Sequence, residues 1–140
     1  MEKIDEFQGE YYFMSNFHNS KVELDGIIYD NAEAAFQAQK CLTTAEKKSF
    51  VGLNPSEAKR KGRHVKLRSD WEQVKTEVMY TVVKNKFSQN ADLREKLLAT
   101  GDAELIEGNT WHDTCWGVCN GKGENRLGKI LVKVRGELRK

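Results

Sequence analysis

From about Ser69 to Phe87 the apolar residues repeat with the period of an α-helix. Apolar side chains recur there at steps of three and four residues, at Trp71, Val74, Val78, Val82 and Val83. This spacing gives one face of an α-helix a stripe of side chains that needs a partner surface. The stretch therefore predicts the central core helix of the chain.

Two further patterns predict regular elements on either side of this helix. A last helix, from about residue 125 to residue 139, has basic residues on one side and on the other the apolar Leu127, Ile130, Leu131, Val134 and Leu138. Residues 22–29 read as two short strands joined at Asp25-Gly26, a dipeptide typical of tight hairpins. The chain thus combines helices with at least one antiparallel strand pair.

Capping boxes mark four helix starts, because an N-cap side chain and a residue three places later can satisfy backbone N–H groups that the first turn leaves free. The pairs are Asp30 with Glu33, Thr43 with Glu46, Asn54 with Glu57, and Ser69 with Glu72. Pro55 supports the third start, since the first helical position needs no N–H donor.

No repeat, low-complexity tract or linker interrupts the 140 residues, and a chain of this length can bury a core without a disulfide or a metal. Two more short strands are expected, at 103–107 and at 115–118. The predicted fold is α+β: a single, predominantly helical domain over residues 1–140 with a small antiparallel sheet.

Charge and cysteine usage narrow the function classes. The formal net charge of +2 is too small to give the whole chain a nucleic-acid-binding field. No apolar run approaches the roughly 20 residues of a membrane span, and the first five residues lack the apolar stretch of a signal peptide. Three cysteines are too few for a secreted disulfide framework. We expect a cytoplasmic protein with reduced thiols.

His112, Cys115 and Cys119 could be mistaken for a zinc cluster. The stretch has no Cys-X-X-Cys pair and no second pair of ligands. Packed or half-exposed thiols explain these cysteines better, so neither a metal nor a cofactor is expected.

The segment Glu107–Gly128 is the most unusual part of the sequence. It holds Trp111 and Trp116 beside Asn, Asp and His side chains. Such a mixture suits a concave site that holds a flat ring, but a loop anchored on the core by its tryptophans would have the same composition. Its glycines lead into Asn125, where they form either a backbone nest for a phosphate or a turn capped by Asn125.

Residues 59–68 contain six Lys or Arg and form the only concentrated basic patch. Such a run is usually a solvated face. Arg63, directly after Gly62, could also present a guanidinium to a ligand phosphate. Nucleic acid is a further candidate partner, although the run lacks the interleaved aromatics of a single-strand binder.

Glu33 has two explanations. In a capping box with Asp30 it would be structural. The small residues Ala34 and Ala35 beside it would, however, let a ligand approach closely. A carboxylate in an apolar pocket at a helix start could titrate usefully or steady a developing cation.

The order of short motifs along the chain resembles the NADAR, or YbiA-like, family. The resemblance covers about residues 12–135, and its joint order is more specific than any one motif. The matching positions are Ser15-Asn16-Phe17, Gly26, Tyr29, Ala32-Glu33-Ala34-Ala35-Phe36-Gln37-Ala38-Gln39-Lys40, Gly62-Arg63, Trp71, Met79, Lys86-Phe87, Thr100-Gly101, Glu107, Asp113, Trp116-Gly117 and Asn125-Arg126-Leu127-Gly128.

This resemblance implies an N-glycosidase, a hydrolase that cleaves the N-glycosidic bond of a ribosyl compound. The substrate classes it suggests are phosphoribosylamino-pyrimidine intermediates of riboflavin biosynthesis and ADP-ribosylated guanine in nucleic acid. A non-catalytic module that binds ADP-ribose or a nucleotide in the same pocket is the alternative.

The resemblance also implies roles for particular residues. Glu33 and Asp113 become the catalytic carboxylates, which would stabilise the positive charge that builds on the sugar as the bond breaks. The implied substrate-binding residues are Asn16, Arg63, Trp71, Lys86, Trp111, Trp116, Gly117 and Asn125. The proposed chemistry needs no metal.

Overall fold

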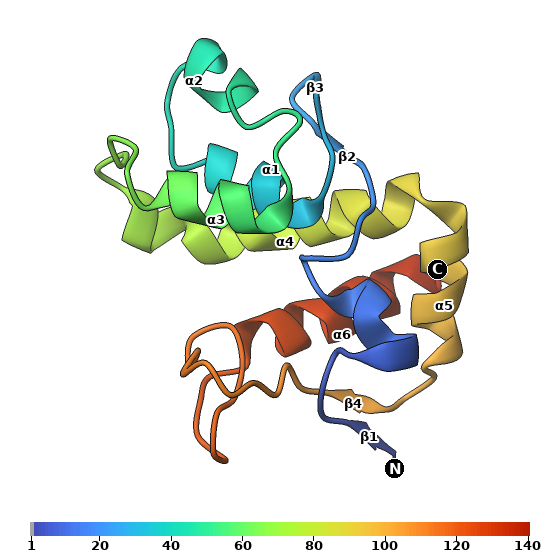
Figure 1. Ribbon diagram of the computed structural model, residues 1–140. Coiled ribbons are helices and arrows are strands. Elements are labelled where there is room, and N and C mark those ends of the chain that lie inside the picture. The colour runs from blue at the N-terminus through green and yellow to red at the C-terminus, as the bar shows by residue number, and fades with distance from the viewer. Residues whose placement is uncertain (1) are drawn as a thin grey trace. The chain divides into compact units, whose positions relative to one another are not determined.

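The computed structural model describes residues 2–140 (Figure 1). Its elements in chain order are β1 (Lys3–Ile4), the 3-10 helix η1 (Gly9–Met14), β2 (Val22–Leu24), β3 (Ile27–Tyr29), α1 (Ala32–Ala38), α2 (Thr44–Lys48), α3 (Pro55–Gly62), α4 (Trp71–Gln89), α5 (Ala91–Ala99), β4 (Glu104–Leu105) and α6 (Arg126–Leu138). They form two compact units, one made of the chain up to Ser15 with Ala91–Lys140, the other of Asn16–Asn90.

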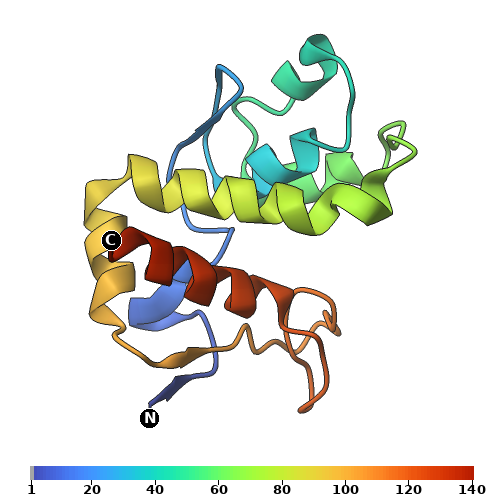
Figure 2. The same cartoon turned by 180° about the vertical axis from the view of Figure 1, so that it is seen from behind.

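In the Asn16–Asn90 unit, α4 is the core helix that the sequence period predicts. The side chains of α4 that are buried are Trp71, Met79, Val82, Val83, Lys86 and Phe87. Val74 and Val78, which the period placed on the same face, are only half-buried. Helix α1 packs against both α3 and α4, as the two views of the ribbon show (Figures 1 and 2).

The predicted hairpin is confirmed in the same unit. Strands β2 and β3 pair antiparallel, with Val22 opposite Tyr29. Asp25 and Gly26 make the turn with φ of 51° and 80°, the left-handed conformations that a tight hairpin of this type requires. Val22 and Tyr29 are fully buried, and β2 packs on α4, so the hairpin covers part of the core helix.

In the other unit, α6 is the predicted last helix and packs on β4 and α5. The strand expected at 103–107 is present as β4, but it pairs in parallel with β1, not antiparallel. Ile4 lies opposite Leu105 in this pair, and both side chains are buried. The pair joins the N-terminal segment to the chain that leads into the polar segment Glu107–Gly128.

The predicted strand at 115–118 is wrong. Only isolated bridges occur in this region, between Gly108 and Val118 and between Cys119 and Lys122. The reason is a turn at Asp113, whose side chain accepts the N–H groups of the two residues that would have begun the strand.

Two of the predicted helix caps are confirmed. Asn54 and Glu57 form a complete capping box, in which the Asn54 side chain accepts the Glu57 N–H at 2.8 Å and the Glu57 carboxylate accepts the Asn54 N–H at 2.9 Å. At α2, Thr43 Oγ1 accepts the Glu46 N–H at 3.2 Å.

The other two caps are wrong, although helices begin close to both. Asn31, not Asp30, caps α1, and its Oδ1 accepts the Ala34 N–H at 2.8 Å. An N-cap must directly precede the first helical residue, and Asp30 is one position too early. Helix α4 begins after Asp70, not Ser69, and without a side-chain cap, because the Asp70 carboxylate pairs with a neighbouring arginine.

Candidate active site

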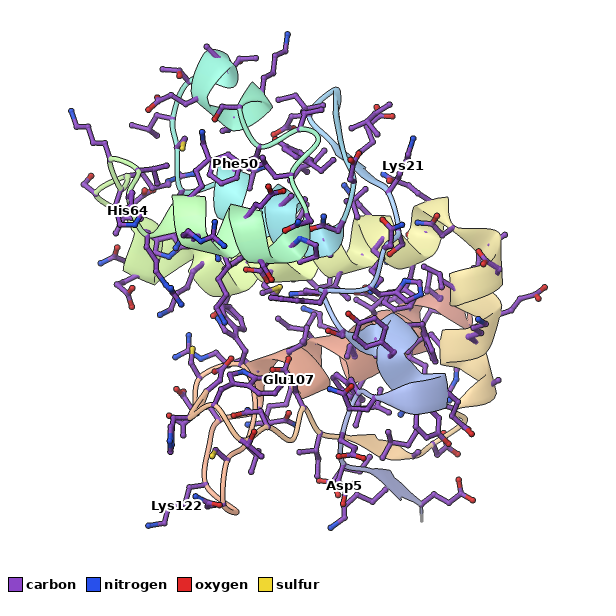
Figure 3. The ribbon with its side chains drawn as sticks, viewed as in Figure 1. Asp5, Lys21, Phe50, His64, Glu107 and Lys122 are labelled. Carbon is purple, nitrogen blue, oxygen red and sulfur yellow. The ribbon has the colours of Figure 1, made fainter. Side chains whose placement is uncertain are left out.

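The residues that the sequence assigns to the site fall into two groups. Those before residue 91 belong to the Asn16–Asn90 unit: Asn16, Glu33, Arg63, Trp71 and Lys86. Those after it belong to the other unit: Trp111, Asp113, Trp116, Gly117 and Asn125. Figure 3 labels His64, in the basic run of the first group, and Glu107, at the start of the polar segment that carries the second.

Glu33 is the second residue of α1 and is 8% exposed. Its backbone N–H donates to the Asn16 carbonyl at 3.1 Å, which ties the helix start to the preceding chain. Its carboxylate Oε2 accepts a hydrogen bond from Gln37 Nε2 at 2.7 Å. Since Asn31 caps the helix, the capping role considered for Glu33 is not the one it plays, and its carboxylate is buried instead.

Lys40 lies two residues after the end of α1, within electrostatic range of both Glu33 and Arg63. Lys40 is half-buried, and burial lowers the pKa of its ammonium group, while Glu33 raises that pKa and Arg63 lowers it. Lys40 Nζ donates to the Gly62 carbonyl at 3.3 Å and lies 5.9 Å from the centre of the Trp71 ring. A buried carboxylate is thus combined with positive charge that could hold a phosphate.

Sequence analysis did not single out Gln37 or Lys40. Both follow Glu33, at steps of four and seven residues, a spacing that in a continuous helix puts side chains on one face; Gln37 lies on α1, and Lys40 lies two residues after its end. This spacing is the signal in the sequence that links both residues to Glu33.

Trp71 and Asn16 are both largely buried. The Trp71 ring packs against Phe36, with 5.2 Å between ring centres. Asn16 Nδ2 lies 3.2 Å from Met79 Sδ, and Asn16 Oδ1 is buried without a hydrogen-bond partner among residues 2–140. Their roles in substrate binding stay predictions.

Lys86 is buried to 1% exposure, and burial lowers the pKa of its ammonium group to about 7 from an ordinary 10.5. Its Nζ lies 5.1 Å from the centre of the Phe87 ring. A lysine with this pKa changes its charge near neutral pH, which gives the side chain a measurable signature.

We expect the free energy of unfolding to depend on pH because of the lowered Lys86 pKa. Between pH 7 and about 10 the unfolded chain holds the Lys86 proton while the folded chain has lost it, so the free energy of unfolding rises with pH by up to about 1.4 kcal/mol per unit. Lys86→Met removes the effect. Urea titrations at four pH values should show the advantage of Lys86→Met over the parent shrinking as the pH rises; a constant difference would contradict the lowered pKa.

Asp113 is fixed in its loop by two sets of hydrogen bonds. Its Oδ1 accepts the N–H groups of Cys115 at 3.1 Å and Trp116 at 2.9 Å. The Asn109 side chain clamps the Asp113 backbone, accepting its N–H at 3.0 Å and donating to its carbonyl at 2.9 Å. The carboxylate therefore has a defined position before any ligand binds.

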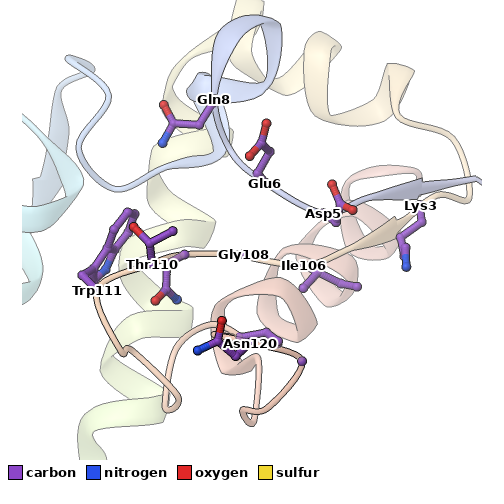
Figure 4. A pocket seen from close by; sticks show the side chains of 12 residues that line it. Lys3, Asp5, Glu6, Gln8, Ile106, Gly108, Thr110, Trp111 and Asn120 are labelled. Carbon is purple, nitrogen blue, oxygen red and sulfur yellow. The ribbon is translucent and has the colours of Figure 1, made fainter.

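Trp111 is 54% exposed and lines a cavity of about 720 Å³ in the same unit. Figure 4 shows Glu6 and Gln8 on the N-terminal segment of this cavity, and Thr110 and Trp111 on the segment after β4. Asp113 and Trp116 are not among the described residues that line it. The role of Trp111 in binding a flat ring stays a prediction.

Gly117 and Asn125 brace the polar segment. A Cβ on Gly117 would collide with the Glu107 carbonyl oxygen. Asn125 Oδ1 accepts the Glu107 N–H at 3.0 Å, and its Nδ2 donates to the Leu105 carbonyl at 2.9 Å. Asn125 precedes α6 but makes no side-chain cap, so the expected capping role is wrong.

Asn125→Ala is therefore expected to lower the free energy of unfolding by about 2 kcal/mol, since it strips partners from the backbone groups of Glu107 and Leu105. Asn120 is the matched control, because it has the same left-handed φ, 53° against 52°, but is exposed. Asn120→Ala should cost only about 1 kcal/mol. Equal losses in urea unfolding of the two variants would mean that backbone strain alone explains the effect.

His112 and the cysteines show no metal-binding arrangement. Cys119 Sγ lies 3.9 Å from His112 Nδ1, and nowhere in residues 2–140 do three or more His, Cys, Asp or Glu side chains gather as metal ligands would.

Within residues 2–140, none of the helices combines the length and apolar character that a bilayer crossing requires.

Comparison with known proteins gives consistent matches over almost the whole chain. The family model of the NADAR domain matches residues 4–139. The N-glycosidase YbiA of Escherichia coli strain K12 is 40% identical over 133 residues, which cover 92% of this chain and 82% of that protein. An N-glycosidase of Nostoc punctiforme is 38% identical over 136 residues, which cover 92% and 86%.

A riboflavin biosynthesis protein of Vibrio vulnificus is 37% identical over 130 residues, which cover 90% of this chain but 35% of that longer protein. The NMR structure of E. coli YbiA matches with a TM-score of 0.87 at 37% identity, and covers 99% of this chain and 87% of that one.

These matches confirm the predicted fold class, α+β and predominantly helical with a small antiparallel sheet. They also confirm the predicted enzyme class at the level of the family, since the relatives are named N-glycosidases, hydrolases of N-glycosyl compounds. The chain belongs to the NADAR domain family.

Proposed function

We propose that this chain is an N-glycosidase that hydrolyses the bond between a ribose and a nitrogen base, with Glu33 and Asp113 as its catalytic carboxylates. The observation that carries the proposal is the state of Glu33: a buried carboxylate that accepts a hydrogen bond from Gln37 and lies within electrostatic range of Lys40. The names of the relatives support the reaction class.

The chemistry explains why such a carboxylate is needed. As the ribosyl C–N bond breaks, positive charge develops on the sugar, and a fixed negative charge stabilises that state more than the ground state. Glu33 would face the anomeric carbon and either attack it or orient a water molecule. The departing base leaves with the bonding electron pair and takes up a proton from water, whose hydroxyl bonds to the anomeric carbon; in the route by direct attack, this water then displaces Glu33 from the sugar.

Asp113 has the second role. Its Oδ1 is already engaged by two backbone N–H groups, so Oδ2 is the atom we assign to the substrate. There it would hold a ribose hydroxyl or assist the departing base. The distance between the two carboxyl groups around one bound ribose would set the stereochemical course, about 5 Å for retention and about 6.5–9.5 Å for inversion.

The first substrate candidate is a phosphoribosylamino-pyrimidine, a class suggested by the name of the Vibrio relative. Lys40 and the exposed Arg63 would hold its phosphate, and Trp111 or Trp116 would stack its ring. ADP-ribosylated guanine, free or in nucleic acid, is the second candidate, which the basic run 59–68 favours. We place the activity in the cytoplasm, where the chain's three free cysteines would stay reduced.

A product assay tests the proposal. The parent chain is incubated with a phosphoribosylamino-pyrimidine and, separately, with ADP-ribosylated guanosine, and the released base and sugar are quantified by chromatography. Equimolar base and sugar from either compound supports the proposal and identifies the substrate class. Saturable binding without release from both compounds would identify a binding module instead and overturn the enzyme assignment.

A further inference from the structure

Gln37 donates a hydrogen bond to the buried Glu33 carboxylate. It lies one turn after Glu33 on α1, is 6% exposed, and its Nε2 donates to Glu33 Oε2 at 2.7 Å. An ionised carboxylate can only accept, so the amide presents its nitrogen to Glu33 and its oxygen to the opposite side.

The amide oxygen of Gln37 then faces α3. Gln37 Oε1 is buried and has no hydrogen-bond partner among residues 2–140. It lies against Gly62, where an added Cβ would collide with Oε1 and approach Gln37 Cδ to 2.7 Å. The backbone angles of Gly62 are those of an ordinary helix, so close approach, not left-handed geometry, is the reason for a glycine at this position.

A buried acceptor without a partner is unfavourable, with a typical cost of about 1–3 kcal/mol. A methionine or leucine at position 37 would fill similar space without that cost. A glutamine here, with a glycine opposite that leaves room for it, points to a use for the Nε2 bond to Glu33 other than stability.

We propose that Gln37 is a positioning residue for the reaction: its amide, wedged against Gly62, holds the Glu33 carboxylate in the orientation that faces the ribose. The inference rests on the proposed role of Glu33. It adds to that role a second residue that does not touch the substrate, and a glycine whose missing side chain sets the geometry.

The chain supplies a matched control at the C-terminal end of α1, where Gln39 is the C-cap residue. Gln39 is 5% exposed, and its Nε2 donates to the Ala35 carbonyl at 3.0 Å and to Tyr29 Oη at 3.4 Å. Gln37→Met and Gln39→Met are thus the same substitution at equal burial. They differ in whether the lost hydrogen bond goes to Glu33 or to groups outside the site.

The test measures kcat, KM and urea stability for both variants. Gln37→Met should lose about 10–100-fold in kcat with KM within about threefold, as expected for a misdirected carboxylate. Its stability should stay within about 1 kcal/mol of the parent, because removing the unpartnered Oε1 offsets the loss of the hydrogen bond to Glu33. Gln39→Met should keep the parent kcat and lose stability. A merely structural Gln37 would give the opposite: lower stability and parental kcat, which would overturn the inference.

Gly62→Ala provides an independent arm. In the parent background it should displace the Gln37 amide and lower kcat about as much as Gln37→Met does. With Gln37→Ala already present, no amide is left to collide, so adding Gly62→Ala should change kcat less than twofold. If the losses in kcat were additive, the contact between the Gln37 amide and Gly62 would not be what orients Glu33.

Failure of this inference is distinguishable from failure of the proposed function. If the parent cleaves substrate and Glu33→Gln does not, but Gln37→Met behaves as the parent, only the positioning role is lost. If Glu33→Gln retains full activity, the proposed function of Glu33 itself fails.

Discussion

Glu33→Gln is expected to lower kcat/KM by about 10³-fold, equivalent to about 4 kcal/mol of transition-state stabilisation, while the chain folds normally. Glutamine has nearly the size of glutamate and keeps a carbonyl oxygen that can accept the Gln37 Nε2 hydrogen bond. The substitution therefore removes mainly the negative charge, which stabilises the positive charge that develops on the sugar.

The measurement combines initial rates of base release with urea unfolding of both proteins. The free energies of unfolding should agree within about 1 kcal/mol, since the helix cap is supplied by Asn31 and does not depend on residue 33. Parental turnover by Glu33→Gln would leave Glu33 as a packing residue and remove the basis of the proposed mechanism.

Asp113→Asn is expected to lower kcat/KM by about 10²-fold with little change in stability. An asparagine keeps the Oδ1 acceptor, so the turn that binds the N–H groups of Cys115 and Trp116 survives, but the negative charge is lost. Asp113→Ala removes both features. It should match or exceed the loss of activity and also lower the free energy of unfolding by about 1–2 kcal/mol.

The two Asp113 variants separate chemistry from architecture. Kinetics and urea unfolding are measured for each on the same substrate. Asp113 would be only a turn residue, and Glu33 would act without it, if two results were found together. Asp113→Asn would keep the parental kcat/KM, and the loss of kcat/KM in Asp113→Ala would match the fraction of protein that is unfolded.

Periodicity explains how much of the fold could be predicted. Helices α4 and α6 and the β2–β3 hairpin carry strong local signals, an apolar stripe in the helices and an Asp25-Gly26 turn in the hairpin. The parallel pairing of β1 with β4 has no such signal. Each strand has two residues, too few to show alternation, and their partners are about 100 positions apart.

The failed strand at 115–118 has a different cause. The apolar residues there fit a strand, but Asp113 binds the following N–H groups and turns the chain. Asx turns of this kind compete with strand pairing, and an aspartate's preference between them depends on contacts outside the local sequence.

A site residue could be predicted where its residue type is unusual for its sequence context. It could not be predicted where its role depends on which distant group it binds. A glutamate among alanines stood out, and the family resemblance made Glu33 a candidate. Which oxygen or nitrogen of an amide faces which neighbour cannot be read from sequence. Asn125 was expected to cap α6, but its side chain binds the backbone at residues 105 and 107; its role at a ligand stays a prediction. Gln37, which the sequence did not single out, binds Glu33.

A structure of Glu33→Gln with an uncleaved ribosyl substrate tests most directly whether Glu33 and Asp113 act on one ribose, as proposed. We expect the side chain of residue 33 within about 3.5 Å of the anomeric carbon, Asp113 hydrogen-bonded to the same sugar or its base, and the two carboxyl positions about 5–9.5 Å apart. A bound substrate whose ribose contacts only one of the two residues would contradict the account.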